Sequence, residues 1–129
     1  PAARDGSWVL DVGCGCGNLS YELLRSGRYC VVGIDRSPWM LAKARHHNQE
    51  FIGQGRAQFL EIDMRKLSLD RQFTFMVASY GVLHHLDDRA GLVSFFKCAH
   101  QHLSERGALY FDVFTERGAR QSFEHRHQI

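Results

Sequence analysis

Short apolar runs alternate along the chain with longer segments in which apolar and polar residues recur at helical spacing. The apolar runs predict strands over about 8–12, 29–34, 57–62, 73–79 and 108–114. The second run is apolar throughout, as expected of a strand whose two faces are both covered by helices. This alternation predicts βαβ units and therefore a mostly parallel sheet.

The segments between these strands are predicted to be helices. One begins at Ser37-Pro38, which offers an N-cap hydroxyl and a proline at the first helical position. Another runs from a cap at Asp87 or Asp88 to about residue 103, and Gly107 is expected to end it. Its expected buried stripe consists of Leu92, Phe95, Phe96, Ala99 and Leu103.

The first apolar run leads directly into a turn that contains Gly13, Gly15 and Gly17. In a strand–turn–helix unit, glycines let the backbone approach a ligand more closely than a Cβ would allow. A dinucleotide fingerprint needs glycines at relative positions one, three and six. Here the sixth position is Asn18, and the third glycine comes one residue early. The turn therefore favours a nucleotide-like ligand, and a nicotinamide-dependent oxidoreductase is the less favoured alternative.

Polar residues follow the ends of the later strands. Asp35 comes directly after the second strand, Asp63 after the third, and Ser79-Tyr80 at the end of the fourth. Ligands of open α/β sheets bind beyond the carboxyl ends of the strands. A carboxylate at Asp35 can accept hydrogen bonds from both hydroxyls of a ribose, and Ser37 already provides the cap of the following helix. Asp63 has an alternative role in an Asx-type turn.

These motifs resemble those of the class I S-adenosylmethionine-dependent methyltransferases. The first strand and the glycine turn are similar to motif I of that family, and residues 33–41 are similar to its G-h-D-x-S-x-x-M-L pattern. Residues 81–86 and 103–109 are similar to family segments that follow the fourth strand and precede the fifth. The resemblance covers about residues 8–115. It implies a Rossmann-like three-layer α/β sandwich with strand order 3-2-1-4-5.

The resemblance also implies which residues bind S-adenosylmethionine. Asp35 would accept from the ribose, Asp63 from the adenine amino group, and Met40 would lie against the adenine unless it belongs to the core. Asp11 would lie near the amino group of the methionine part, or it would only organise the glycine turn. The expected cofactor contacts are Asp11, Gly13, Cys14, Gly15, Gly17, Asp35, Arg36, Met40, Asp63, Met64 and Ser79.

Methyl transfer from a sulfonium depends on alignment and on exclusion of water, because the positive sulfur already activates the carbon. An acceptor that must lose a proton also needs a base. Tyr80, His84 and His85 follow the fourth strand, and His84 is the preferred candidate, with Tyr80 as the second. The alternative is that both histidines pack the following loop. His102 and the other histidines are expected at the surface, and no metal site is predicted.

The sequence favours a small-molecule methyl acceptor. The fourth strand lacks the Asp/Asn-Pro-Pro-Tyr/Phe ending of methyltransferases that act on amines of nucleic acids or on protein glutamine. A net charge of +2 without a basic run argues against a nucleic-acid partner. No apolar run approaches the ~20 residues that a membrane helix needs. The four cysteines are expected to be free thiols in a reducing cytoplasm.

A single domain is expected over residues 1–129, with a core at about 8–115 and a solvated polar tail at 116–129. Strands six and seven of the family would then be missing, and strand five would be an unpaired edge. We therefore expect a truncated chain, or a missing segment or second copy that covers this edge. The alternative function is a non-catalytic S-adenosylmethionine-binding or interaction module, or an inactive fragment.

Overall fold

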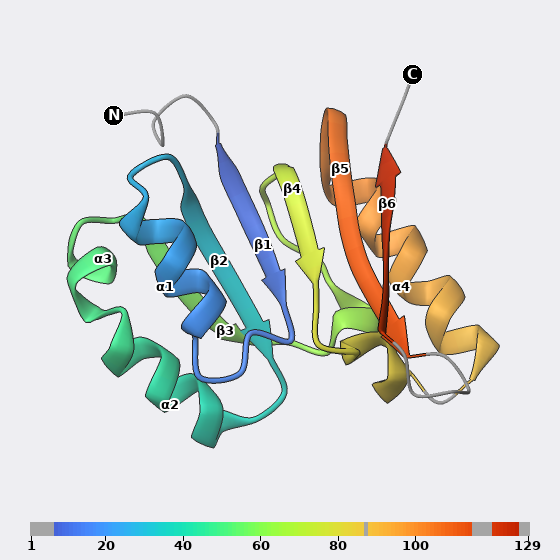
Figure 1. Cartoon of the computed structure of the whole chain (residues 1–129), viewed down its shortest axis with the longest axis horizontal. Coiled ribbons are helices and arrows are strands. Elements are labelled where there is room, and N and C mark those ends of the chain that lie inside the picture. Colours follow the sequence, from blue (N-terminus) through green and yellow to red (C-terminus); the bar gives the residue numbers. More distant parts are fainter. Residues whose placement is uncertain (1–6, 87, 115–119, 127–129) are drawn as a thin grey trace.

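One six-stranded sheet organises the part of the chain that the structure, a computed structural model, describes: residues 7–86, 88–114 and 120–126, the last range and 113–114 by backbone alone. The strand order is β3-β2-β1-β4-β5-β6, and β1 to β5 run parallel (Figure 1). The strands are β1 (Trp8–Val12), β2 (Cys30–Asp35), β3 (Ala57–Glu61), β4 (Phe73–Ala78), β5 (Leu103–Phe114) and β6 (Arg120–Arg126). The predicted α/β class and the order 3-2-1-4-5 are confirmed.

Helices cover both faces of this sheet, which gives the expected three layers (Figure 1). The helices are α1 (Asn18–Arg25), α2 (Pro38–His47), α3 (Gln49–Gly53), α4 (Arg89–His102) and the 3₁₀ helices η2 (Met64–Lys66) and η3 (Val82–His85). The first three pack on one face and α4 on the other. As predicted, α2 begins at a cap, where the Ser37 hydroxyl accepts from the Met40 N–H at 3.2 Å.

Alternate strand residues point to opposite faces and so build two cores. Val9 and Val31 pack on the side of α1, whereas Leu10 and Val32 pack on the side of α4. Each fully buried aliphatic side chain of this kind contributes ~1.5–3 kcal/mol relative to an exposed one. The two cores therefore fix β1 and β2 from both sides, and this rigid pair carries the glycine turn at its carboxyl end.

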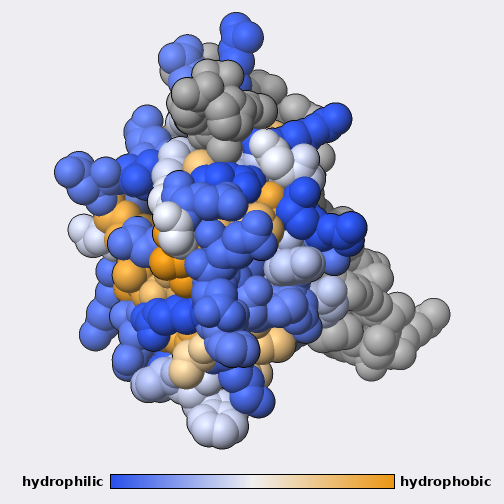
Figure 2. All heavy atoms as spheres, turned by 90° about the vertical axis from the view of Figure 1, so that its left-hand side faces the viewer, coloured by the Kyte–Doolittle hydropathy of each residue, from blue (hydrophilic) through white to orange (hydrophobic). Residues whose placement is uncertain are grey.

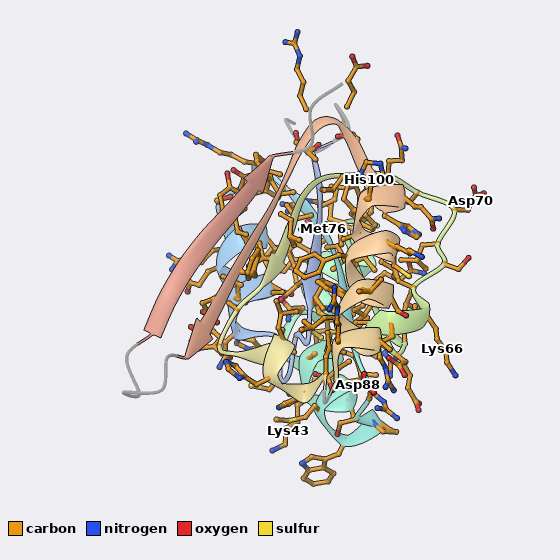
Figure 3. The ribbon with its side chains drawn as sticks, turned by 90° about the vertical axis from the view of Figure 1, so that its right-hand side faces the viewer. Lys43, Lys66, Asp70, Met76, Asp88 and His100 are labelled. Carbon is orange, nitrogen blue, oxygen red and sulfur yellow. The ribbon has the colours of Figure 1, made fainter. Side chains whose placement is uncertain are left out.

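The outer surfaces of the helices are polar. Figure 3 looks onto α4, with Met76 fully buried beneath it and with His100, Lys66 and Asp70 at the outside. The side of the molecule that carries α2 and α3 is mostly hydrophilic, with hydrophobic side chains visible between the polar ones (Figure 2). Scattered apolar side chains of this kind are normal on a solvated face.

The expectation that strand five is an unpaired edge beside a solvated tail is wrong. Residues 120–126 form β6, which pairs antiparallel with β5 from Ala108↔Arg126 to Phe114↔Arg120. Strand pairing uses backbone N–H and C=O groups, so a polar sequence can still add a strand. Polar and charged residues are typical of such an outer strand. The polarity of this segment reflects its place at the edge of the sheet.

The last helix ends close to residue 103, as predicted, but the expectation that Gly107 ends it is wrong. α4 ends at His102, and β5 begins at Leu103 without a loop. The register between β4 and β5 shifts between Phe73 and Phe75, where Arg106 has φ 67°. A Cβ at Gly107 would lie 2.8 Å from the Ser104 carbonyl oxygen. This glycine therefore permits a close backbone approach within an irregular strand start.

His102 is buried, although the sequence predicts it at the surface. The Leu69 N–H donates to its Nε2 at 2.9 Å, so Nδ1 carries the proton that is donated to the Cys98 carbonyl at 2.7 Å. Both ring nitrogens are thus satisfied inside the fold. The predicted stripe of α4 needs a smaller correction, because Phe95 and Ala99 are buried but Phe96 is 36% exposed.

Candidate functional site

The glycine turn lies at the carboxyl end of β1, between β2 and the loop after β4. The N–H groups of Gly13 and Cys14 both donate to the Ile34 carbonyl, at 2.8 and 2.9 Å, so β2 holds the turn in place. A Cβ at Gly13 would collide with the Val82 side chain, and Gly13 has φ 69°. A side chain is therefore excluded here both by space and by backbone conformation.

The other two glycines of the turn differ from each other. A Cβ at Gly17 would lie 2.7 Å from Asn48 Nδ2 and 3.0 Å from Ala44 Cβ, so Gly17 lets α1 pack closely on α2. A Cβ at Gly15 would meet no atom within 4 Å. The backbone at Gly15 therefore faces open space, where a ligand can approach the main chain.

Asp35, at the end of β2, links this turn to α2. Its Oδ2 accepts from the Gly15 N–H and its Oδ1 from the Ser37 N–H, both at 2.9 Å. A carboxylate offers about four lone-pair directions. Two backbone donors fix the orientation of the Asp35 side chain and leave acceptor capacity for the hydroxyls of a ligand.

An open cavity of about 370 Å³ lies in front of these groups. Its volume is within the ~300–1,000 Å³ typical of small-ligand sites. The lining residues are Gly13, Gly15, Asp35, Arg36, Met40, Ser79, Tyr80, Val82 and His85. The cavity therefore brings together predicted residues from the turn after β1, the end of β2, α2 and the loop after β4. These segments are distant in the sequence and meet at the carboxyl ends of the strands.

Asp11, Cys14 and Gly17 lie behind this cavity and do not line it. Asp11 is 2% exposed, and its Oδ2 accepts from the Ser20 hydroxyl at 2.7 Å. Burial raises the pKa of Asp11 to about 6, despite the hydrogen bond from Ser20. Burial also raises the pKa of the Cys14 thiol. These residues support the turn from within the fold.

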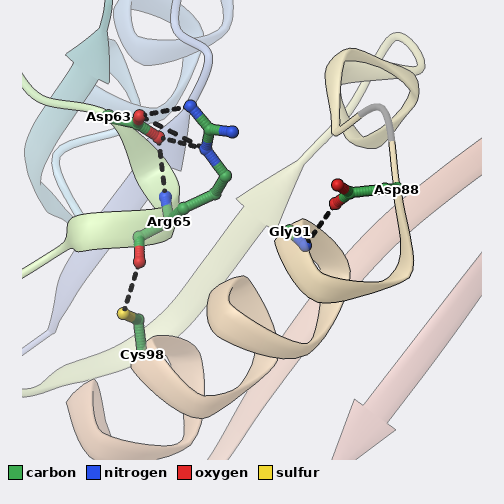
Figure 4. Close-up of polar contacts among 5 residues, drawn as sticks. All are labelled: Asp63, Arg65, Asp88, Gly91 and Cys98. Atoms are coloured by element: carbon green, nitrogen blue, oxygen red, sulfur yellow. Dashed lines mark hydrogen bonds and ion pairs between the residues drawn. The ribbon is translucent and has the colours of Figure 1, made fainter.

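Asp63 also lies outside the cavity lining and has a local partner. Its carboxylate accepts from the Arg65 backbone N–H at 3.0 Å and forms an ion pair with the Arg65 guanidinium at 2.7 Å (Figure 4). This contact lowers the pKa of Asp63 to about 2, with a smaller contribution from Arg36. Asp63 caps η2, which is the Asx-type alternative, and the Met64 side chain packs in the core.

The loop after β4 borders the cavity on its other side. Tyr80 lines the cavity and is 74% exposed. His85 lines it too, whereas His84, the preferred base candidate of the sequence analysis, does not. Both histidines are exposed and lie in η3. The 3₁₀ helix turns adjacent side chains in different directions, and the sequence alone gave no means to choose between them.

The loop after β4 also depends on a buried acid, Asp112, that the sequence analysis did not predict as part of the site. Asp112 on β5 is 2% exposed and accepts backbone hydrogen bonds from Tyr80 and Gly81. A single acid inside the apolar run from Tyr110 to Phe114 was the available signal, because an unpaired buried charge is costly and implies buried donors.

Within 7–86, 88–114 and 120–126, no group of three or more His, Cys, Asp and Glu side chains could hold a metal ion. In the same part of the chain, no helix is long and apolar enough to cross a membrane.

Comparison with known proteins identifies the class to which this fold and cavity belong. A family model described as "Methyltransferase domain" matches residues 9–107. The chain belongs to this methyltransferase domain family, as the resemblance in the sequence implied.

Individual relatives are similar over part of their length. The chain is 38% identical over 80 residues to a tRNA U34 carboxymethyltransferase of Aeromonas salmonicida, covering 62% of this chain and 24% of that protein. It is 37% identical over 86 residues to a ubiquinone biosynthesis O-methyltransferase of Nitrosococcus oceani, covering 67% and 33%. The chain thus spans a third or less of these two curated relatives.

A solved structure has the same fold. The crystal structure of an S-adenosylmethionine-dependent methyltransferase from Clostridium acetobutylicum superposes with a TM-score of 0.73 at 27% sequence identity. The match covers 84% of this chain and 43% of that one.

Proposed function

We propose that this domain binds S-adenosylmethionine and takes part in methyl transfer to a small-molecule acceptor. The observation that carries the proposal is the cavity at the strand ends, where the backbone at Gly15 meets the fixed carboxylate of Asp35. Family membership supports the same reaction class. Fold alone would not, because one fold hosts many functions.

The cavity has two sides with different roles in this proposal. The donor half, formed by residues 13–17 and 35–40, holds the adenosine, with the ribose hydroxyls donating to Asp35. Arg36 and Met40 lie beside the adenine, and the expected contacts from Asp11, Cys14 and Gly17 become indirect supports of the turn. Asp63 and Met64 lie outside the cavity lining, and Asp63 influences the adenine only through Arg36, whose charge contributes to its lowered pKa.

The acceptor half, formed by residues 79–85, faces the methyl group. S-adenosylmethionine supplies a methyl carbon that is activated by its positive sulfur. The protein aligns the acceptor with that carbon and limits access of water, and such alignment is worth ~7–11 kcal/mol. Where the acceptor must lose a proton, His85 or Tyr80 takes it, because both line the cavity. We place this role at His85 before Tyr80.

Charge, similarity to relatives and cysteine chemistry bear on the acceptor class and the compartment. A net charge of +2 without a basic run supports a small molecule over RNA. An RNA acceptor is the second candidate, because the chain is similar to a tRNA enzyme over 80 residues. No disulfide joins the cysteines at 14, 16, 30 and 98, which supports a reducing compartment such as the cytoplasm.

Two measurements test the proposal. Calorimetry compares S-adenosylhomocysteine with NADH, and tighter binding of NADH would contradict the cofactor assignment. Labelled methyl transfer from S-adenosylmethionine is then followed into the small-molecule and RNA fractions of a cell extract. Label in small molecules is expected. Label in RNA alone would mean that the methyl acceptor is RNA and not a small molecule. Binding of S-adenosylhomocysteine without any methyl transfer would favour the non-catalytic module.

A further inference from the structure

Asp112 lies behind the loop that borders the acceptor half. The pairing of β4 with β5 reaches Ala78↔Phe111, so Asp112 comes one residue beyond the last pair, where β4 gives way to the loop. On its other side, Asp112 pairs with Ser122 of β6. The residue is therefore held within the sheet, and its buried carboxylate contacts the loop that follows β4.

Both carboxylate oxygens of Asp112 accept backbone hydrogen bonds from the loop. Oδ2 accepts from the Tyr80 N–H at 3.0 Å, and Oδ1 accepts from the Gly81 N–H at 2.6 Å. Hydrogen bonds to an ionised acceptor are shorter and stronger than those between neutral groups. A buried carboxylate without such donors would be heavily penalised. The loop and the carboxylate therefore stabilise each other.

These hydrogen bonds hold an unusual backbone conformation. Tyr80 has φ 58° and Gly81 has φ 68°, two consecutive residues in the left-handed region. Glycine adopts this region without cost, whereas tyrosine does not. A residue in such a conformation persists where its surroundings determine it. The carboxylate of Asp112 is a contact that both N–H groups share.

The left-handed pair sets the course of the chain along the cavity. It directs the backbone into η3, whose Val82 packs against Gly13 of the glycine turn. The same turn places Tyr80 and His85 along the cavity. An ordinary negative φ at Tyr80 would redirect the chain before η3 and separate the acceptor half from the donor half.

We propose that Asp112 is a positioning residue, which fixes the acceptor half against the glycine turn by holding the N–H groups of Tyr80 and Gly81. Asp112 does not line the cavity, so it acts through the loop. The inference rests on the proposed function only where it assigns this side of the cavity to the methyl acceptor.

The test compares Asp112→Ala with Asp88→Ala as a matched control. Asp88 also accepts a backbone N–H, that of Gly91 at 2.8 Å, but it does so at the start of α4 and away from the cavity lining (Figure 4). The ¹³Cα and ¹³Cβ chemical shifts of Tyr80 report its backbone conformation. They are expected to move toward values of negative φ in Asp112→Ala and to stay unchanged in Asp88→Ala.

A second readout separates positioning from stability alone. At saturating S-adenosylmethionine, the rate of labelled methyl transfer to a small-molecule extract is expected to fall by ~100-fold in Asp112→Ala, since small misplacements cost that much. The dissociation constant of S-adenosylhomocysteine is expected to change by less than about threefold, because the donor half keeps its own contacts. The control variant is expected to keep both values.

The outcomes are distinct. Unchanged Tyr80 shifts in Asp112→Ala would overturn the inference, whatever the cofactor result. If the wild-type protein bound no S-adenosylhomocysteine, the proposed function would fail, and the Tyr80 shifts would still decide the role of Asp112. Should Asp112→Ala not fold, Asp112→Asn is measured instead. It keeps one acceptor oxygen, so one of the two amides is expected to lose its protection from hydrogen exchange, and full protection of both would contradict the inference.

Discussion

The two halves of the cavity are built by contacts of different range. In the donor half, Asp35 accepts from Gly15 and Ser37, 20 and two positions away, within one βαβ unit. In the acceptor half, Tyr80 and Gly81 depend on Asp112, 32 and 31 positions away on another strand. A ligand site can therefore combine a half that a local motif encodes with a half that exists only once the sheet has formed.

The largest expected loss of stability concerns the contact between the two halves, where Val82 packs against Gly13. Gly13→Ala is expected to lower the free energy of unfolding by ~2–5 kcal/mol, because it adds a clash with Val82 to the cost of a left-handed alanine. Gly15→Ala has only the cost of a left-handed alanine, ~1–2 kcal/mol, because a Cβ there meets no other atom. Urea denaturation measures both variants. Equal losses would mean that the halves do not touch as described.

The buried support of the donor half has a pH dependence. The pKa of Asp11 is raised from 3.8 to about 6, so its ionisation is disfavoured in the folded state. Its stabilising contribution is therefore full below about pH 4 and is lost as the pH rises to about 6, by at most ~3 kcal/mol. In Asp11→Asn this loss should disappear from unfolding curves between pH 4 and 7. Asp70→Asn, at an exposed site, is the control and should keep it.

Removal of the Asp35 carboxylate, which accepts hydrogen bonds in the donor half, should weaken ligand binding. Asp35→Ala is expected to raise the dissociation constant of S-adenosylhomocysteine about tenfold to a hundredfold (~1–3 kcal/mol), because the ribose hydroxyls lose a charged acceptor. Isothermal calorimetry measures the change. An unaltered affinity, in a variant that remains folded by circular dichroism, would remove Asp35 from the site.

The smallest effect on stability and cofactor affinity is expected at Asp63, which lies outside the cavity lining. Asp63→Asn loses the ion pair with a partly exposed Arg65 and keeps an oxygen that can cap η2, so stability should fall by less than ~1 kcal/mol. The affinity for S-adenosylhomocysteine should stay within about twofold, since Asp63 is outside the cavity lining. A loss of affinity as large as that of Asp35→Ala would indicate that Asp63 contacts the adenine directly.

Sequence reasoning recovered those parts of the molecule that depend on local pattern. Apolar runs predicted β1 to β5, and Ser37-Pro38 predicted the start of α2, because hydrophobic periodicity and capping act within a few residues. Glycine spacing and Asp35 indicated one side of the cavity for the same reason. These features lie on neighbouring strands that a right-handed βαβ unit places together.

The features that sequence reasoning missed are set by distant contacts. β6 forms through backbone pairing with β5, and this pairing requires no apolar pattern in the sequence of a polar edge strand. His102 is buried because Leu69 and Cys98 satisfy its ring, and neither contact is visible in the helical pattern. Which of His84 and His85 lines the cavity depends on the loop after β4, whose Tyr80 and Gly81 N–H groups donate to Asp112 on a distant strand.

The most direct test of the proposed cofactor site is a titration of the ¹⁵N-labelled protein with S-adenosylhomocysteine. If the cofactor lies over the glycine turn, the largest amide shifts fall at Gly13, Gly15, Asp35 and Arg36, with smaller ones at Ser79 and Tyr80. A second hollow of about 250 Å³ on the α1 face of the sheet, lined by Val9, Leu23, Tyr29, Phe75, Val77 and Tyr110, provides the contrast. Shifts confined to that hollow, or none at all at saturating ligand, would contradict the account.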